Sequence, residues 1–174
     1  MIRSFNGKTP NIAGSAFVSE AAYIVGDVEI GENVSIWPGA VIRGDFGSIK
    51  IGKNTIIEDT CVIHSGSPSG PIANVTIGDN VQIGHGAVIN CPRIGNNVLI
   101  GMNATILHDA EIGNFCVIGA GSLVSQGMVV PDRSFVAGVP GEIKGRVTQK
   151  QLWWVEEGSP LYHELAKQYK QEGL

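Results

Sequence analysis

The sequence predicts an all-β solenoid, a coil of short parallel strands, and three observations support this fold class. Glycine supplies 24 of 174 residues, about twice its usual share of roughly 7%. Aromatic residues make up only 6% of the chain, so the core has to be built from aliphatic side chains. Most directly, an aliphatic residue recurs every six positions over most of the sequence. A fixed short period of this kind is typical of repeat architectures.

The six-residue step predicts the positions of the strands. It runs through Ile12, Val18, Ile24, Ile30, Ile36 and Ile42, resumes after a short interruption at Ile51, Ile57 and Ile63, resumes again at Ile77, Ile83 and Ile89, and after one five-residue step continues from Ile94 through Ile100, Ile106, Ile112, Ile118, Val124, Val130 and Val136. Three short strands per turn would take about 18 residues, and successive turns would stack at about 4.8 Å. A helical period of 3.6 does not fit.

A second inward position accompanies the first. Four residues after many of the aliphatic positions there is a small or β-branched residue, namely Val34, Ala40, Thr55, Cys61, Val81, Ala87, Val98, Ala104, Ala110, Cys116 or Ser122. Two inward positions in every six residues, with corners between them, describe a triangular coil. Glycine often directly follows the aliphatic residue, and we expect it at corners that turn tightly or need a positive φ.

The six-residue step ends before the C-terminus. We therefore expect the β-helix over residues 1–146 and a helical appendage, packed on it, over residues 147–174. Thr148 with Gln151 forms a capping-box pattern, and Gly158 is expected to end that helix. A second helix is expected from Ser159-Pro160, with Leu161, Leu165 and Tyr169 on the face that packs on the coil.

Composition excludes several functions and partners. The net charge is −4 and there is no basic stripe, which argues against a nucleic-acid partner or an anionic membrane surface. No apolar run approaches the roughly 18 residues that would span a bilayer, and the N-terminus does not resemble a secretory signal. Three cysteines without CxxC spacing favour free thiols and the reducing cytoplasm.

The cysteines and histidines differ in how well the repeat explains them. Cys61 and Cys116 occupy inward positions and are expected to be small buried residues, whereas Cys91, at the five-residue step, is expected to be more exposed. His64 directly follows Ile63, and His85 and His108 each lie two positions after an inward isoleucine. They are therefore not core residues. His163, on the appended helix, is expected to be solvated.

Two interruptions of the repeat lie where chemistry is expected. The segment 43–48 departs from the six-residue step after Ile42, and the segment 65–74 forms a loop directly after His64. Loops on a rigid scaffold commonly carry function. The adjacent carboxylates Glu58 and Asp59 precede His64 at a corner.

These residues form a pattern that resembles the γ-class carbonic anhydrases and their bacterial and archaeal relatives. The pattern consists of Ile42-Arg43-Gly44-Asp45, Glu58-Asp59 five to six residues before His64, Ile83-Gly84-His85-Gly86-Ala87-Val88, and the ending Ala137-Gly138-Val139-Pro140-Gly141. The resemblance covers nearly the whole chain. It implies that the β-helix is left-handed and built of hexapeptide repeats, and that the protein is a homotrimer.

The resemblance also implies a metal site at each subunit interface, binding Zn²⁺, or Fe²⁺ or Co²⁺, and acting on CO₂ and bicarbonate. By position, His64 matches the first family ligand and His85 the second, which comes from the neighbouring subunit. Arg43 and Asp45 match an interface ion pair. Asp59 matches a carboxylate that pairs with the arginine and supports the site.

Two positions depart from the family pattern. The third family histidine is replaced by Asn90, and Glu58 stands where the family usually has an amide residue. An amide oxygen is a weaker and harder donor than imidazole, so affinity for zinc should fall. Glu58 could compensate as a carboxylate ligand or could orient the metal-bound water from outside the ligand set. His108 is a further candidate for completing the site.

Three functions remain open from the sequence. The first is a zinc-dependent lyase that hydrates CO₂ reversibly. The second is a hexapeptide acyltransferase with His85 or His108 as general base, in which the Arg43-x-Asp45 pattern has no evident role. The third is a non-catalytic trimeric scaffold or binding module that has lost its third histidine.

Overall fold

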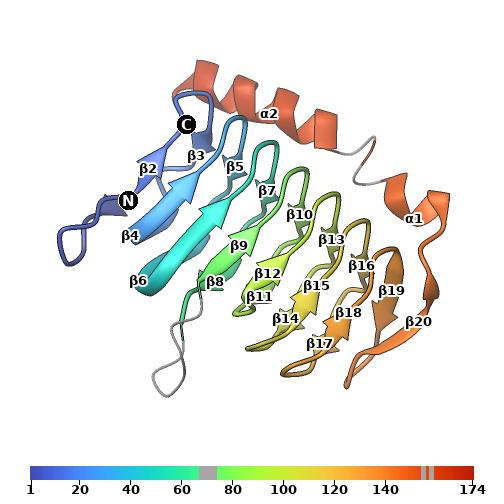
Figure 1. Cartoon of the computed structure of the whole chain (residues 1–174). Coiled ribbons are helices and arrows are strands. Elements are labelled where there is room, and N and C mark those ends of the chain that lie inside the picture. The colour runs from blue at the N-terminus through green and yellow to red at the C-terminus, as the bar shows by residue number, and fades with distance from the viewer. Residues whose placement is uncertain (67–73, 154–155, 157–158) are drawn as a thin grey trace.

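The computed structural model describes residues 1–66, 74–153, 156 and 159–174. Its main body is a parallel β-solenoid of about seven turns that matches a left-handed β-helix, as expected (Figure 1). The strands are β1 (Ile2–Arg3), β2 (Asn11–Ile12), β3 (Phe17–Val18), β4 (Tyr23–Ile30), β5 (Ser35–Ile36), β6 (Val41–Ile51), β7 (Ile56–Ile57), β8 (Val62–His64), β9 (Val75–Ile77), β10 (Gln82–Ile83), β11 (Val88–Ile89), β12 (Arg93–Ile94), β13 (Leu99–Ile100), β14 (Thr105–Ile106), β15 (Glu111–Ile112), β16 (Val117–Ile118), β17 (Leu123–Val124), β18 (Val129–Val130), β19 (Ser134–Ala137) and β20 (Glu142–Arg146). The helices are α1 (Gln149–Trp153) and α2 (Ser159–Glu172).

The strands form three faces that run along the solenoid. The first face contains the start of β4, the start of β6, and then β8, β11, β14 and β17. The second face contains β2, the ends of β4 and β6, and then β9, β12, β15 and β18. The third face contains β3, β5, β7, β10, β13, β16 and β19, with β20 antiparallel to β19 at its end. The strands β4 and β6 cross the corner between the first two faces.

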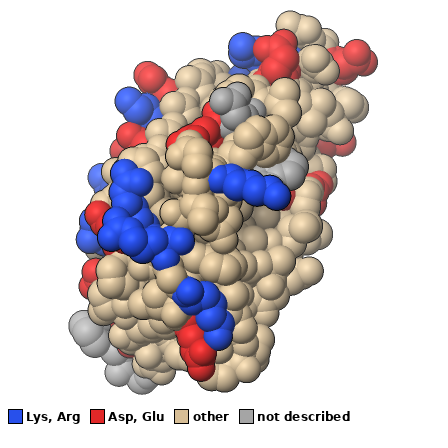
Figure 2. All heavy atoms as spheres, turned by 90° about the vertical axis from the view of Figure 1, so that its right-hand side faces the viewer, with Lys and Arg blue, Asp and Glu red and all other residues tan. Residues whose placement is uncertain are grey.

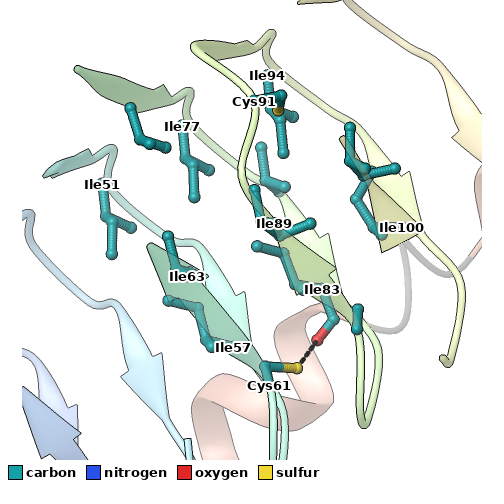
Figure 3. Packing of buried hydrophobic residues seen from close by; sticks show 14 of the residues in the cluster. Ile51, Ile57, Cys61, Ile63, Ile77, Ile83, Ile89, Cys91, Ile94 and Ile100 are labelled. Carbon is teal, nitrogen blue, oxygen red and sulfur yellow. Dashed lines mark hydrogen bonds between the residues drawn. The ribbon is translucent and has the colours of Figure 1, made fainter. Parts of the chain in front are cut away.

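The core consists of the inward positions that the repeat predicted. The isoleucines of consecutive coils stack on one another, as Figure 3 shows for Ile57, Ile63, Ile83 and Ile89, and each of these four is fully buried. The predicted small positions are buried as well, from Val34 to Ser122. Burying a residue of this size contributes about 1.5–3 kcal/mol, so the stacked core accounts for much of the stability.

The cysteine predictions were right for Cys61 and Cys116 and wrong for Cys91. All three are free thiols and all three are buried. Cys91 is 0% exposed because it points inward at the five-residue step, and Figure 3 shows it beside Ile94. The Cys61 Sγ donates to the carbonyl oxygens of Ile83 (3.7 Å) and Gly84 (3.1 Å), which ties two consecutive coils together.

Glycine was expected at corners that turn tightly or need a positive φ, and the glycines that directly follow the aliphatic residues do not take a positive φ. Asparagine takes the left-handed conformation instead, at Asn33, Asn54, Asn80 and Asn97. The side-chain amides of the first three each donate to the amide oxygen of the next asparagine, one coil further on, at 3.1–3.3 Å, which forms an asparagine ladder. Glycine is needed for close approach between coils, because a Cβ on Gly78 would lie 2.7 Å from the Gly95 carbonyl carbon.

The C-terminal segment returns along the third face. Thr148 and Gln151 begin α1 with the expected capping contact, since the Thr148 backbone N–H donates to Gln151 Oε1 at 2.8 Å. The expected helix end at Gly158 lies outside the described residues. The helix α2 then lies over the first coils (Figure 1), where it contacts β3 and β5.

The face of α2 that packs on the coil differs from the prediction. Tyr162, Ala166 and Tyr169 contact an aromatic cluster that includes Phe17 and Trp37, and the Trp37 and Tyr169 ring centroids are 5.1 Å apart. Leu161 and Leu165 are 63% and 38% exposed. The prediction placed the larger aliphatic residues inward, but the third face presents aromatic rings there, and tyrosine packs edge-on against them.

Two further observations concern the rest of the chain. Neither of the helices that the structure describes is long and apolar enough to cross a membrane. Of the loop expected over residues 65–74, positions 67–73 lie outside the described residues, while Ser65 is buried and donates to the Gly47 carbonyl oxygen at 2.7 Å.

Candidate metal centre at the edge of the first face

Three of the predicted site residues lie one above another on consecutive coils. Arg43 and His64 are register partners in β6 and β8. Asn90 directly follows Ile89, whose register partner is Ile63, the residue before His64. The same local pattern, an inward isoleucine followed by a polar residue at the corner, therefore places a guanidinium, an imidazole and an amide at one edge of the first face.

His64 is held by a carboxylate that also binds Arg43. The His64 Nε2 lies 2.9 Å from Asp45 Oδ1, and Arg43 Nη1 lies 2.5 Å from Asp45 Oδ2. Partial burial alone would raise the pKa of Asp45, but the hydrogen bonds and charges of Arg43 and His64 more than offset this and lower it. The Phe46 ring packs against the imidazole at a centroid distance of 5.7 Å.

His85 lies at the corner between β10 and β11 and contacts two carboxylates. Its Nε2 lies 2.9 Å from Glu58 Oε2 and its Nδ1 lies 2.8 Å from Asp59 Oδ2. The resemblance implied that Asp59 pairs with Arg43; within one chain Asp59 contacts His85 instead. The adjacent carboxylates that the sequence placed at a corner thus hold the second candidate ligand.

Glu58 is the most enclosed of the predicted residues, at 3% exposed. The Gln82 Nε2 donates to its Oε1 at 2.8 Å, and the His85 backbone N–H donates to its Oε2 at 3.0 Å. Tyr162 reaches it from α2. Burial, the negative charge of Glu58 and a hydrogen bond to that carboxylate together raise the pKa of Tyr162 to about 12.

Sequence reasoning missed Gln82 and Tyr162 as members of this site. Gln82 had a usable signal, because it is an amide at an outward position of the third face where apolar residues occupy the neighbouring coils. Tyr162 had none, because it comes from α2 and meets Glu58 only when that helix returns over the solenoid.

Asn90 retains an unused acceptor. Its backbone N–H donates to the Ile106 carbonyl oxygen at 3.0 Å, but its side-chain Oδ1 is buried and has no hydrogen-bond partner among the described residues. A buried acceptor without a partner costs about 1–3 kcal/mol relative to a satisfied one. Such an atom beside the position of His64 fits a site completed by a metal ion or by another subunit.

Within a single chain, only some of the predicted metal ligands are arranged so that they could bind a metal ion. No group of three His, Cys, Asp or Glu side chains among the described residues could hold a metal ion. His64 fits, since a metal-binding imidazole commonly contacts a carboxylate through its other nitrogen, and Asn90 has a free oxygen. His85 could bind a metal only after one of its two carboxylate contacts is broken, because an imidazole that donates a hydrogen bond through both nitrogens has no free lone pair for a metal.

The other two histidines lie away from this group. His108 follows β14, and its carbonyl oxygen accepts from the Gly127 backbone N–H at 3.1 Å. His163 was expected to be solvated, but it belongs to α2 and is half-buried, and its Nε2 lies 3.3 Å from the Asn54 carbonyl oxygen. Burial and the charge of Lys167 lower the pKa of His163, against a smaller opposing effect of the Asn54 carbonyl.

The chain is similar to known carbonic anhydrases along most of its length. The family described as "Bacterial transferase hexapeptide (six repeats)" matches residues 10–44 and 92–126, and "Hexapeptide repeat of succinyl-transferase" matches residues 54–91. A probable carbonic anhydrase of Methanocaldococcus jannaschii is 45% identical over 158 residues, which cover 90% of this chain and 96% of that protein. The carbonic anhydrase of Geobacillus kaustophilus is 39% identical over 98% of this chain and 91% of that protein.

The chain belongs to the γ-carbonic-anhydrase-like proteins of the hexapeptide-repeat family. It spans about 60% of the length of two mitochondrial γ carbonic anhydrases of Arabidopsis thaliana, to which it is 33% identical. A solved structure titled a putative acetyltransferase, from Bacillus cereus, is also similar, at 37% identity, a TM-score of 0.90 and coverage of 98% of this chain and 96% of that one.

Proposed function

We propose that this protein is a metal-dependent enzyme that hydrates CO₂ reversibly, in the cytoplasm, at the interfaces of a homotrimer. His64 and Asn90 of one subunit and His85 of the next would hold Zn²⁺, or Fe²⁺ or Co²⁺. The observation that carries this proposal is the alignment of His64 and Asn90 on consecutive coils. Asp45 orients His64, and the Asn90 Oδ1 is buried without a partner among residues 1–66, 74–153, 156 and 159–174.

The trimer is supported by the outward side chains of the first face. Tyr23, Val41, Val62, Val88 and Leu123 all lie on one line of register partners, and Thr105 is the single polar member of that line. Tyr23 and Val88 are each 37% exposed, so much of this apolar line is open to solvent in one chain. An exposed contiguous apolar stripe usually marks an interface.

The other two faces are less suited to self-association. The second face carries charged outward residues, including Glu29, Lys50, Arg93 and Glu111, of which the first two form an ion pair at 3.0 Å. The third face is covered over its first coils by α2. The first face is also the one whose edge carries Arg43, His64 and Asn90, so association there would bring these residues to a neighbouring chain.

The chemistry divides between the metal and this chain's residues. A divalent metal held by these residues would supply a Lewis acid that lowers the pKa of water. Glu58 would serve as the proton acceptor, because it is buried and held in one orientation by Gln82 and Tyr162. Asp45 would orient His64, and Arg43 would hold Asp45. Because the Asn90 amide is a weaker donor than imidazole, metal affinity should be lower than with three histidines.

The first experiment is elemental analysis of the untagged protein purified without added metal. The proposal predicts about one zinc, iron or cobalt ion per chain, and a stopped-flow assay of each metal form should then detect CO₂ hydration. Absence of any transition metal, even after incubation with each ion, would refute the proposal of a metal-dependent enzyme. It would favour the alternative of a non-catalytic scaffold that has lost its third histidine.

A second candidate function is acyl transfer. It is favoured by the similarity to the Bacillus cereus structure titled a putative acetyltransferase, and His85 would then be the general base, oriented by Asp59. Calorimetric titration with acetyl-CoA separates the two functions, since only an acyltransferase of this kind has to bind it.

A further inference from the structure

A pocket of about 300 Å³ adjoins the candidate metal centre on the third face. Its lining includes Glu58 and His85 from the site and Tyr162 from α2. One water molecule needs only about 10–15 Å³ of such volume, so the pocket is far larger than a three-atom substrate such as CO₂ requires. It lies at the lower end of the range, about 300–1,000 Å³, that is usual for organic ligands.

The floor of this pocket is apolar except for one residue. Gln82, Leu99 and Val117 are register partners on three consecutive coils and all three line it. Met102 and Ala120 line it as well. The aliphatic part of a ligand would therefore contact apolar side chains along most of the ligand's length.

Gln82 presents a hydrogen-bond acceptor that a ligand in the pocket could use. Its Nε2 is used by Glu58 at 2.8 Å, which fixes the orientation of the amide. Its Oε1 is buried and has no hydrogen-bond partner in the part of the chain that the structure describes, although Gln82 as a whole is 4% exposed and lines the pocket. A buried acceptor of this kind favours a ligand that supplies an N–H or O–H donor.

We infer that this pocket binds a small organic molecule that has an apolar body and an N–H or O–H donor, of which an aliphatic primary amide is the simplest example. The donor bonds to the Gln82 Oε1 and the aliphatic chain lies over Leu99 and Val117. Because Glu58 and His85 border the pocket, such a molecule lies beside the proposed catalytic groups. The inference rests on the proposed function only in treating those two residues as the site.

The test uses hexanamide and its N,N-dimethyl derivative, which has the same acyl chain but no N–H. Binding to the purified full-length protein, with and without metal, is followed by ligand-observed NMR. We expect hexanamide to bind saturably and about tenfold more tightly than the dimethyl amide, which is the effect of one hydrogen bond to a buried acceptor. Equal affinity of the two amides, or no saturable binding of hexanamide, would overturn the inference.

A blocking variant locates the binding. Leu99→Trp fills the floor of the pocket and should weaken hexanamide binding at least about tenfold, whereas Val129→Trp, at an outward position of the second face, should leave it unchanged. Circular dichroism and sedimentation verify the fold of each variant. Met102 is 53% exposed at the pocket, so Met102→Trp replaces Leu99→Trp if the latter does not fold. Unchanged binding in the folded blocking variant would refute the location.

The two proposals fail in different ways. Retained hexanamide binding in a protein that neither binds a metal nor hydrates CO₂ would refute the proposed function and support the pocket. An active metal enzyme that does not bind hexanamide would refute the pocket and leave the proposed function standing.

Discussion

His64 and Asn90 follow paired isoleucines on consecutive coils, so the imidazole and the amide occupy equivalent corner positions one strand spacing apart. This relationship is set by the backbone register and does not depend on either side chain. Asn90→His should therefore place a second imidazole beside His64 without changing the fold. It would also replace the buried Oδ1, for which no described residue supplies a hydrogen-bond donor.

We predict that Asn90→His raises zinc affinity by at least about tenfold and increases the hydration rate of the zinc form, because imidazole is a better donor to zinc than an amide oxygen. Competition with a chromophoric chelator measures the affinity, and stopped-flow measures the rate. Asn97→His, at the asparagine ladder, is the matched control and should not change zinc affinity. Equal zinc affinity in Asn90→His and the wild type would contradict the assignment of Asn90 as a ligand.

We predict that Glu58→Gln lowers kcat for CO₂ hydration by about 10²-fold and leaves KM within about twofold, as expected when a proton acceptor is lost. The amide can still accept the His85 backbone N–H, so the corner should keep its conformation. Glu29→Gln removes an exposed carboxylate of the second face and serves as the control. A kcat close to that of wild type would show that Glu58 only supports the site.

The apolar line on the first face leads to a prediction about assembly. Val88→Asp should convert the proposed trimer into monomers, because a charge buried at a subunit interface without a partner is unfavourable by several kcal/mol. Val129→Asp places the same charge at an exposed position of the second face and should leave the proposed trimer intact. Sedimentation velocity distinguishes these outcomes, and a trimeric Val88→Asp protein would place the interface elsewhere.

The buried thiols should be unreactive. Burial raises the pKa of Cys61 and of Cys91 to about 12, and it raises the pKa of Cys116 as well. At pH 8 the native protein should therefore react with a thiol reagent at least about 100-fold more slowly than the unfolded chain. The pKa of Cys61 is higher in the folded protein than in the unfolded chain. Its protonated thiol therefore contributes fully to the stability of the folded state below pH 9.0, and this contribution is lost as the pH rises toward about 12. Rapid labelling of any one thiol at pH 8 would contradict its burial.

Acidification should loosen α2 through His163. Its pKa is lowered from 6.5 by burial, so its contribution to stability is present above pH 6.5 and is lost as the pH falls through the lower, folded value. We expect the melting temperature of His163→Gln to fall less than that of wild type between pH 7 and pH 5, by roughly a degree or two. Glutamine can still donate to the Asn54 carbonyl oxygen, so the variant keeps that contact. Identical pH profiles would mean that His163 does not contribute.

The repeat could be predicted from the sequence because every coil obeys the same local rule. Each inward isoleucine is buried by its neighbours one strand spacing above and below, so a six-residue pattern is sufficient to place it. The pattern did not distinguish the two ways of making a corner. Asn54 takes the positive φ, whereas Gly78 is needed because the next coil lies too close for a Cβ.

The candidate site could be predicted only in part. Arg43, His64 and Asn90 follow from the register of consecutive coils, and the pairing of His85 with Glu58 and Asp59 involves neighbouring corners. Tyr162 belongs to a different element, and no local rule connects it to Glu58. Contacts between α2 and the solenoid depend on the path of the whole C-terminal segment, which a short-range pattern does not specify.

The position of α2 has a consequence for the order in which the protein matures during synthesis. Phe17, Trp37 and Ile56 belong to the first coils, but α2, which covers them, is synthesised after all of the coils. The growing chain therefore displays an aromatic surface until α2 has been made, even if its coils have already stacked. A chain cut before α2 would leave that surface uncovered, so such truncated chains are expected to aggregate or to be recognised by chaperones.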